Sequence, residues 1–282
     1  MSLPLPPRPA DYDKEPTLGT WSYDRKDWGG QDDASSLGAI RAAFERGIRK
    51  IDTAYAYGNG RSETLLTRAL GPDLARCFVA SKLGPKGKAA NFTRGIEASL
   101  KRLKREQIDL FYLHWPSSMI ELRPTLDALA DARNRGVVRY IGVCNCPPRL
   151  LAEIHAHVSL DAVQDGYNFL WRKPEGGVIE FSRKKGIGFE AYSPLAQGVL
   201  VNPAPEPVSY APGDKRKDLL FYSPSVHPAV LTAVKEVRRI AEKWGISPLT
   251  AAYGWLTSRE GVDSVILGFR NSRQVREGLD AY

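Results

Sequence analysis

The chain alternates between short apolar segments and longer amphipathic segments from about residue 17 to its end. The apolar segments have the length and composition of buried strands, and the amphipathic ones repeat apolar residues at helical spacing, as Leu37, Ile40 and Phe44 do. Parallel strands in one sheet need helical crossovers to join them. Eight strand-then-helix units joined by short links therefore predict a single α/β domain, a closed (β/α)8 barrel of the TIM type.

Several helix ends are recognisable from single residues. Ser62 with Glu63, Asn91 and Ser247 each precede an amphipathic segment and are expected to cap the helix that follows. Three of the expected helices span residues 33–49, 178–185 and 228–244.

Two segments of the chain lack the strand-then-helix pattern. Residues 1–16 are rich in proline and lack the basic-then-apolar pattern of a secretory signal, so we expect an extended tail there. The barrel domain is expected to occupy residues 17–282. Residues 193–227 form a long segment with several prolines, which we expect to be a functional or mobile loop because compact domains seldom contain loops of that length.

Polar side chains occur where three consecutive strands end. Asp52 and Tyr57 lie where the second strand passes into a glycine-rich turn, and the next two strands end at Lys82 and His114. Taken singly, these are ordinary turn, packing, ion-pair and core residues. The carboxyl ends of the strands of a barrel meet at one face, where barrel enzymes hold their catalytic groups. We therefore expect the four side chains to lie together.

These four residue types suit the reduction of a carbonyl group, which needs a hydride at carbon and a proton at oxygen. A free tyrosine has a pKa of about 10 and releases its proton reluctantly. A lysine cation beside Tyr57 is expected to lower that pKa, and Asp52 to keep Lys82 charged and oriented. The imidazole of His114 can donate to the carbonyl oxygen.

The run Ile51-Asp52-Thr53-Ala54-Tyr55-Ala56-Tyr57-Gly58-Asn59-Gly60-Arg61-Ser62-Glu63, the strand ending in Lys82, and Asp109-Leu110-Phe111-Tyr112-Leu113-His114-Trp115-Pro116 resemble the catalytic signatures of the aldo-keto reductase superfamily. The first run is the most specific, because it fixes an acid, glycines, a serine and a glutamate within one short segment. The resemblance extends from Gly19 to about Glu277. It implies that Tyr57 is the proton donor, Lys82 and Asp52 tune it, and His114 orients the substrate.

The resemblance also implies a nicotinamide dinucleotide. Asn145 and Gln164 would bind the nicotinamide carboxamide, and Tyr192 would stack on the ring. Arg270 offers a planar fork suited to a 2′-phosphate, which favours NADPH over NADH. The other cofactor residues implied are Gly19, Thr20, Trp21, Asp52, Ser193, Pro194, Leu195, Gly198, Arg216, Gly268, Gln274 and Glu277.

Some positions depart from the family pattern. Cys144 replaces the usual serine before Asn145, while Leu267 and Gly278 replace a proline and an asparagine near the adenine site. The chain stops at Tyr282, without the tail that lines the substrate pocket in many relatives. We therefore expect an open mouth for substrate, with Tyr57 and His114 at its floor. Its expected rim consists of Trp21, Tyr23, Trp28, Trp115 and Trp171.

Charge and composition argue against a nucleic-acid partner and against a membrane-spanning segment. The net charge of +8 comes from basic residues scattered over helix faces, so no nucleic-acid partner is expected. No apolar run is long enough to cross a membrane. The three cysteines, Cys77, Cys144 and Cys146, suggest reduced thiols in a cytoplasmic protein, with Cys144 and Cys146 facing one side of a strand. No metal is expected, and the chain is expected to be a monomer or a weak homo-oligomer.

The resulting hypothesis is NADPH-dependent reduction of small aldehydes or ketones. One alternative is a cofactor-binding regulatory subunit with negligible turnover, similar to the potassium-channel β subunits. Another is a barrel aldolase that forms a Schiff base on Lys82. A lysine paired with Asp52 stays protonated, which makes it a poor nucleophile.

Overall fold

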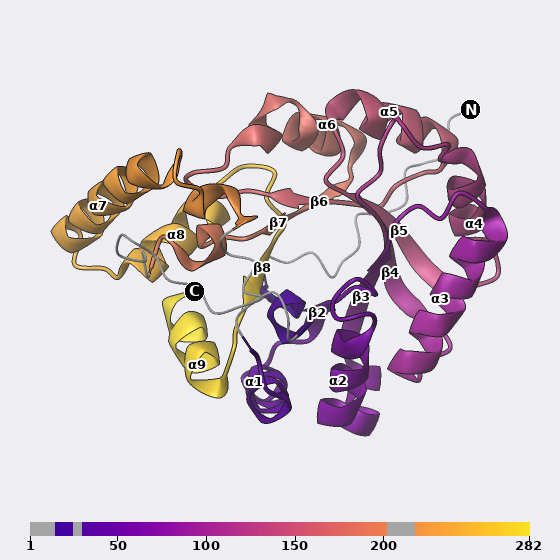
Figure 1. The fold of residues 1–282 in the computed structure, drawn as a ribbon, viewed down its shortest axis with the longest axis horizontal. Helices are drawn as coiled ribbons and strands as arrows, with labels where there is room; N and C mark the ends of the chain where they lie inside the picture. The colour runs from indigo at the N-terminus through magenta and orange to yellow at the C-terminus, as the bar shows by residue number, and fades with distance from the viewer. Residues whose placement is uncertain (1–14, 25–29, 202–217) are drawn as a thin grey trace.

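The computed structural model describes residues 15–24, 30–201 and 218–282, and these contain the whole of the predicted barrel sheet. Eight parallel strands follow one another in chain order, and the eighth pairs with the first, so the barrel is closed as predicted (Figure 1). The strands are β1 Thr17–Gly19, β2 Lys50–Asp52, β3 Phe78–Leu83, β4 Ile108–His114, β5 Val138–Cys144, β6 Ala162–Gly166, β7 Gly188–Tyr192 and β8 Ser264–Gly268.

Helices surround this barrel in chain order, and α7 and α8, which both connect β7 to β8, project together to one side (Figure 1). None of the helices in the described residues is both long and apolar enough to cross a membrane. The helices are α1 Asp33–Glu45, α2 Arg61–Leu70, α3 Ala89–Leu103, α4 Arg123–Asn134, α5 Pro148–His157, α6 Val178–Lys185, α7 His227–Lys243, α8 Pro248–Thr257 and α9 Ser272–Ala281.

Local sequence explains where many of these helices start. The helices α4, α5, α7 and α8 all carry a proline in their first turn, where its fixed φ fits and its missing N–H is not needed. Ser247 caps α8 as predicted, because its hydroxyl accepts from the Thr250 N–H. The predicted cap at Asn91 is wrong: α3 begins at Ala89, so Asn91 lies inside the first turn.

The strands have two buried faces, as expected for a parallel barrel. Side chains that point into the barrel form a small inner cluster, and those on the opposite face pack against the helices in a much larger core. On β3, for example, Val79 belongs to the outer core and Ala80 to the inner cluster. Successive side chains of each strand therefore point alternately into the barrel and toward the helices.

The alternation fails just beyond β5, and this corrects one prediction. Cys144 belongs to the inner cluster, but Cys146 belongs to the outer core. The strand ends at Cys144, and Asn145 adopts a left-handed conformation with φ 58°. That turn breaks the two-residue period, so the two thiols do not share a face.

Candidate active site

The glycine-rich turn between β2 and α2 has a fixed shape. Gly60 stands at the start of α2 with φ 85°, and a Cβ at this position would collide with the side chain of Arg102. The positive φ favours glycine there, and a Cβ would also displace the end of the Arg102 side chain. The sequence predicted that Ser62 and Glu63 cap this helix, and that prediction is wrong. Both residues lie buried within the first turn of α2.

These two buried residues tie α2 to the barrel. Ser62 Oγ donates to the Thr20 carbonyl at 2.8 Å. Glu63 accepts from Ser81 Oγ at 2.6 Å, and its other carboxylate oxygen pairs with Arg102 Nε at 2.5 Å. Because both carboxylate oxygens have partners, the cost of burying Glu63 is compensated. The turn that carries Tyr57 is held between these anchored elements.

Three of the four predicted catalytic residues meet at the ammonium group of Lys82. Asp52 ends β2, Lys82 lies near the end of β3, and Tyr57 lies in the turn after β2. The Lys82 ammonium group is fully buried and donates to Asp52 Oδ1 at 2.5 Å, Thr53 O at 3.0 Å and Tyr57 Oη at 3.1 Å. An ammonium has three protons to donate, so these three bonds satisfy it. The structure thus brings Asp52, Tyr57 and Lys82 into direct contact.

His114 completes the group from the end of β4. Its ring lies edge-on to the ring of Tyr57, with centroids 6.2 Å apart and an interplanar angle of 85°. Trp115 follows it, with its ring centroid also 6.2 Å from that of His114. All four predicted catalytic side chains therefore gather at the carboxyl end of the barrel.

The protonation states follow from burial and from Lys82. Burial acts to lower the pKa of Lys82, but Asp52 and Tyr57 raise it above its ordinary value, so the side chain stays an ammonium ion. Burial raises the pKa of Tyr57 to about 12, although Lys82 opposes the rise. Burial, assisted by Lys82, lowers the pKa of His114 to about 3, which leaves the imidazole neutral.

The expectation that Lys82 makes Tyr57 more acidic than a free tyrosine is therefore wrong. The direction of the lysine effect is as expected, but the desolvation of a phenolate is the larger effect. Tyr57 therefore keeps its proton at neutral pH. The site presents a neutral phenol, a neutral imidazole and a buried cation, which is a donor set suited to a carbonyl oxygen.

A second layer of polar groups lies beneath the tetrad inside the barrel. Gln164 Nε2 donates to Asp52 Oδ2 at 2.9 Å and to Glu190 Oε2 at 3.2 Å. The Tyr112 hydroxyl donates to the same Glu190 oxygen at 2.6 Å. Sequence reasoning missed Glu190, although its position two residues before Tyr192 on one strand indicates that both side chains enter the barrel.

Three strands end in the same unusual backbone conformation. The residues that follow β4, β5 and β7 are Trp115, Asn145 and Ser193, with φ values of 55°, 58° and 55°. A left-handed conformation costs a residue with a side chain about 1–2 kcal/mol, and such strain concentrates at functional sites. All three positions lie at the tetrad end of the barrel.

Hydrogen bonds fix the positions of several predicted cofactor residues after β1, β5 and β7. Tyr192 Oη donates to Asn145 Oδ1 at 2.7 Å, which fixes both side chains, and Asn168 Nδ2 donates to the Ser193 carbonyl at 2.9 Å. Pro194, Leu195 and Gly198 continue this segment. Thr20 is buried, and its hydroxyl donates to the Asp52 carbonyl. A Cβ on Gly19 would collide with Ile266, so Gly19 permits close packing of β1 against β8.

The segment after β8 offers groups that fit a phosphate. Gly268 ends β8, and Arg270 lies just before the N-terminus of α9, whose first N–H groups attract anions. The backbone N–H of Arg270 donates to Gln274 Oε1 at 2.8 Å, and its Nε donates to Gln31 Oε1 at 3.2 Å. Glu277 lies further along α9 and pairs with Arg273. The predicted contact Arg216 lies outside the described residues.

The predicted aromatic rim is only partly present in the structure. Trp115 is 57% exposed, while Trp21 and Trp171 are half-buried. Tyr23 is fully buried in the outer core, so its expected place at the rim is wrong. The short 3-10 helix η1, Trp21–Asp24, turns Tyr23 inward. Trp28 lies outside the described residues.

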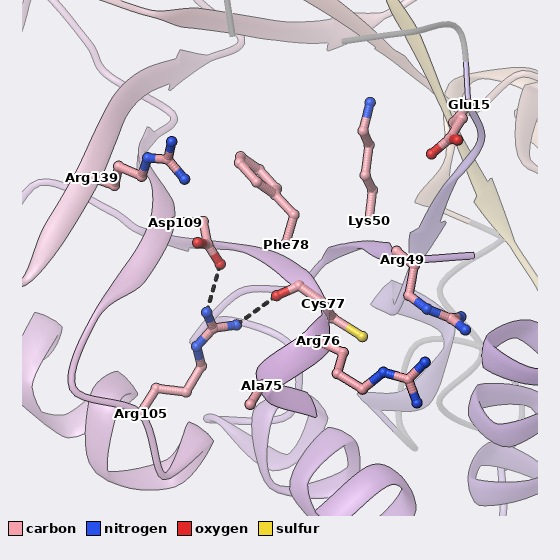
Figure 2. A pocket seen from close by; sticks show the side chains of 10 residues that line it. All are labelled: Glu15, Arg49, Lys50, Ala75, Arg76, Cys77, Phe78, Arg105, Asp109 and Arg139. Carbon is pink, nitrogen blue, oxygen red and sulfur yellow. Dashed lines mark hydrogen bonds and ion pairs between the residues drawn. The ribbon is translucent and has the colours of Figure 1, made fainter. Parts of the chain in front are cut away.

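A cavity of about 380 Å³ lies at the opposite end of the barrel, beside the amino ends of β2 and β3 (Figure 2). Its lining is mainly basic, but Arg105 pairs with Asp109 at 2.8 Å and donates to the Cys77 carbonyl. None of the tetrad residues lines it. This cavity is therefore separate from the candidate active site.

Comparison with known proteins gives one consistent result. The model of the aldo/keto reductase family matches residues 17–282. Aldo-keto reductase YhdN of Bacillus subtilis is 30% identical over 271 residues, which cover 92% of this chain and 82% of the relative. The glycerol dehydrogenase AKR11B4 from Gluconobacter oxydans superposes with a TM-score of 0.83 at 28% identity, covering 94% of this chain and 85% of that one.

A further solved structure bears on the fold alone. The aldo/keto reductase from Klebsiella pneumoniae in complex with NADP and acetate has a TM-score of 0.71 at 23% identity, covering 94% of this chain and 84% of that one.

Proposed function

Because this chain belongs to the aldo/keto reductase family, we propose that it reduces small aldehydes or ketones to alcohols with NADPH, using Tyr57 as the proton donor. Members of this family generally reduce carbonyl groups with NAD(P)H. The observation that carries the proposal is the contact of the buried Lys82 ammonium with both Asp52 and the Tyr57 hydroxyl.

The reaction needs a proton at the carbonyl oxygen as negative charge develops there. The bound reduced nicotinamide supplies the hydride. Tyr57 holds the proton to be transferred, and Lys82 stabilises the phenolate that the transfer leaves behind. Although burial raises the pKa of Tyr57, the stabilisation by Lys82 increases as the phenolate forms. Asp52 keeps Lys82 in place during this step.

His114 has a separate role in this proposal. With its pKa lowered to about 3, it is neutral and can donate one N–H to the substrate oxygen without competing with Tyr57 as an acid. The edge-on packing of its ring against Tyr57 keeps the two side chains adjacent. Two donors on one oxygen would orient the carbonyl carbon toward the nicotinamide.

The choice of NADPH rests on the segment after β8. The guanidinium of Arg270 beside the N-terminus of α9 suits a 2′-phosphate, which NADH lacks. In the nicotinamide region we assign Asn145 and Gln164 to the carboxamide and Tyr192 to the ring face.

Trp21 and Trp115 are proposed to contact the substrate beside Tyr57 and His114. Aromatic side chains at a pocket rim favour apolar or aromatic aldehydes. The three buried free cysteines are consistent with a reducing compartment, so we propose that the protein is cytoplasmic. That it is a monomer or weak homo-oligomer stays a prediction.

The proposal is tested by titrating the protein with NADPH and NADH and then following NADPH oxidation with a panel of small aldehydes. We expect tighter binding of NADPH, and the preference should disappear in Arg270→Met. Turnover with at least one aldehyde is expected. Protein that binds NADPH but turns over none of them would instead support the regulatory-subunit alternative.

A further inference from the structure

Below the tetrad, Glu190 is a buried acid to which the proposed reaction assigns no role. It lies inside the barrel on β7 and is 4% exposed. Burial and the nearby Asp52 raise the pKa of its carboxyl group, so its place in the barrel is electrostatically costly. Two donors, Tyr112 Oη and Gln164 Nε2, converge on its Oε2 atom and offset part of that cost.

Glu190 is connected to the proposed proton donor through a short series of contacts. Gln164 bonds both Glu190 Oε2 and Asp52 Oδ2. The other oxygen of Asp52 binds Lys82, which in turn contacts the hydroxyl of Tyr57. The direction of the Asp52 carboxylate is therefore set from two sides, by Lys82 and by Gln164.

The far end of this series is held by packing. The ring of Tyr112 lies against Gly142 of the neighbouring strand β5, where a Cβ would collide with it. Tyr112 is fully buried. Its hydroxyl therefore has little freedom to move away from Glu190.

We propose that Glu190 is a positioning residue, which holds Gln164 against Asp52 and so keeps Lys82 in contact with Tyr57. The inference rests on the proposed function, since it concerns the same tetrad. Gln164 has two amide protons, and the two carboxylates engage its Nε2 atom. Its side-chain oxygen is then the group it presents to the nicotinamide carboxamide, so Gln164 acts there as an acceptor.

Two variants separate position from charge. Glu190→Gln removes the charge but keeps an oxygen that can accept from Tyr112 and Gln164. Glu190→Met has a similar length, also lacks the charge, and offers no such acceptor. We expect Glu190→Gln to keep kcat within about threefold of wild type and Glu190→Met to lower it about tenfold, the effect of losing one to two hydrogen bonds. The dissociation constant for NADPH should change less than kcat in both.

A readout without substrate tests the arrangement itself. The side-chain amide signal of Gln164 in a ¹⁵N spectrum, assigned by its loss in Gln164→Ala, should exchange slowly with solvent in wild type and in Glu190→Gln. In Glu190→Met the exchange should be faster. Tyr112→Phe removes one of the two donors to Glu190 and should give a smaller loss of kcat, which keeps the test available if Glu190→Met does not fold.

Two results would overturn the positioning role: equal kcat in wild type and Glu190→Met, or equal losses in both Glu190 variants, which would indicate a role for charge alone. Failure of the proposed function looks different. Wild-type protein would then turn over no aldehyde, whereas the Gln164 exchange comparison would still support or overturn the arrangement.

Discussion

Replacing Lys82 with methionine tests the energetics of the buried ion pair. Met has a similar length but no charge, so the change leaves the Asp52 carboxylate buried without its cation. Lys82 is fully buried and Asp52 is 3% exposed, so solvent cannot compensate. Removing one partner of a buried pair costs about 3–5 kcal/mol. Asp52 keeps its bond from Gln164, which places the expected loss near the lower end of that range.

The assay is denaturant unfolding for the free energy and thermal unfolding for the melting temperature, both followed by far-UV circular dichroism and tryptophan fluorescence. A loss of about 3 kcal/mol should lower the melting temperature of a chain of 282 residues by roughly 5 °C, because the unfolding entropy is about 2.1 cal/mol/K per residue. The matched control is the double variant Asp52→Asn with Lys82→Met, which removes both charges. It should recover about 1–3 kcal/mol relative to the sum of the two single variants, since the residues are in contact.

The reasoning would be refuted if Lys82→Met alone cost less than about 1 kcal/mol, the value typical of an exposed pair. It would also be refuted by strict additivity in the double variant. Either result would mean that the ion pair does not hold its partners as the geometry indicates.

Three further predictions concern single groups. Because the pKa of His114 is lowered to about 3, kcat/KM should show no histidine titration between about pH 5 and 8, and a step near 6.5 would contradict a neutral His114. Burial raises the pKa of Asp165 to about 6, so folding favours its protonated form. That contribution to stability is present below about pH 4 and is lost as the pH rises to about 6, so thermal unfolding should show Asp165→Asn more stable than wild type by up to about 3 kcal/mol at pH 7 and little changed at pH 4. Gly142→Ala should displace Tyr112 and cost about 1–3 kcal/mol of unfolding free energy, whereas Gly38→Ala, at an open helical position, should be neutral or stabilising; equal effects would contradict the tight packing at Gly142.

The barrel and the grouping of the tetrad were both predictable from local sequence. Each strand and helix carries its own period, and a parallel barrel places all strand ends on one face. The position of Lys82 beside Asp52 follows from this topology, because β2 and β3 are neighbours. No knowledge of side-chain conformations was needed for that step.

Other features depend on three-dimensional detail that the sequence does not contain. Burial raises the pKa of Tyr57 and Lys82 lowers it. The sequence indicates that Lys82 is near Tyr57, but it does not show how deeply Tyr57 is buried. The opposite facing of Cys144 and Cys146 depends on the left-handed backbone of Asn145, which a two-residue period cannot anticipate. Glu190 resembles an ordinary polar strand residue until β7 is placed in the barrel.

The most direct test of the proton-donor role of Tyr57 is a single-turnover measurement of NADPH oxidation in Tyr57→Phe, at saturating dinucleotide and aldehyde. The Phe ring keeps the packing against His114 and removes only the hydroxyl that Lys82 contacts. The rate should fall by about 10²–10⁴-fold, the range for loss of a general acid, while the dissociation constant for NADPH stays near that of wild type. A variant that keeps more than about a tenth of the wild-type rate would show that the proton comes from another group.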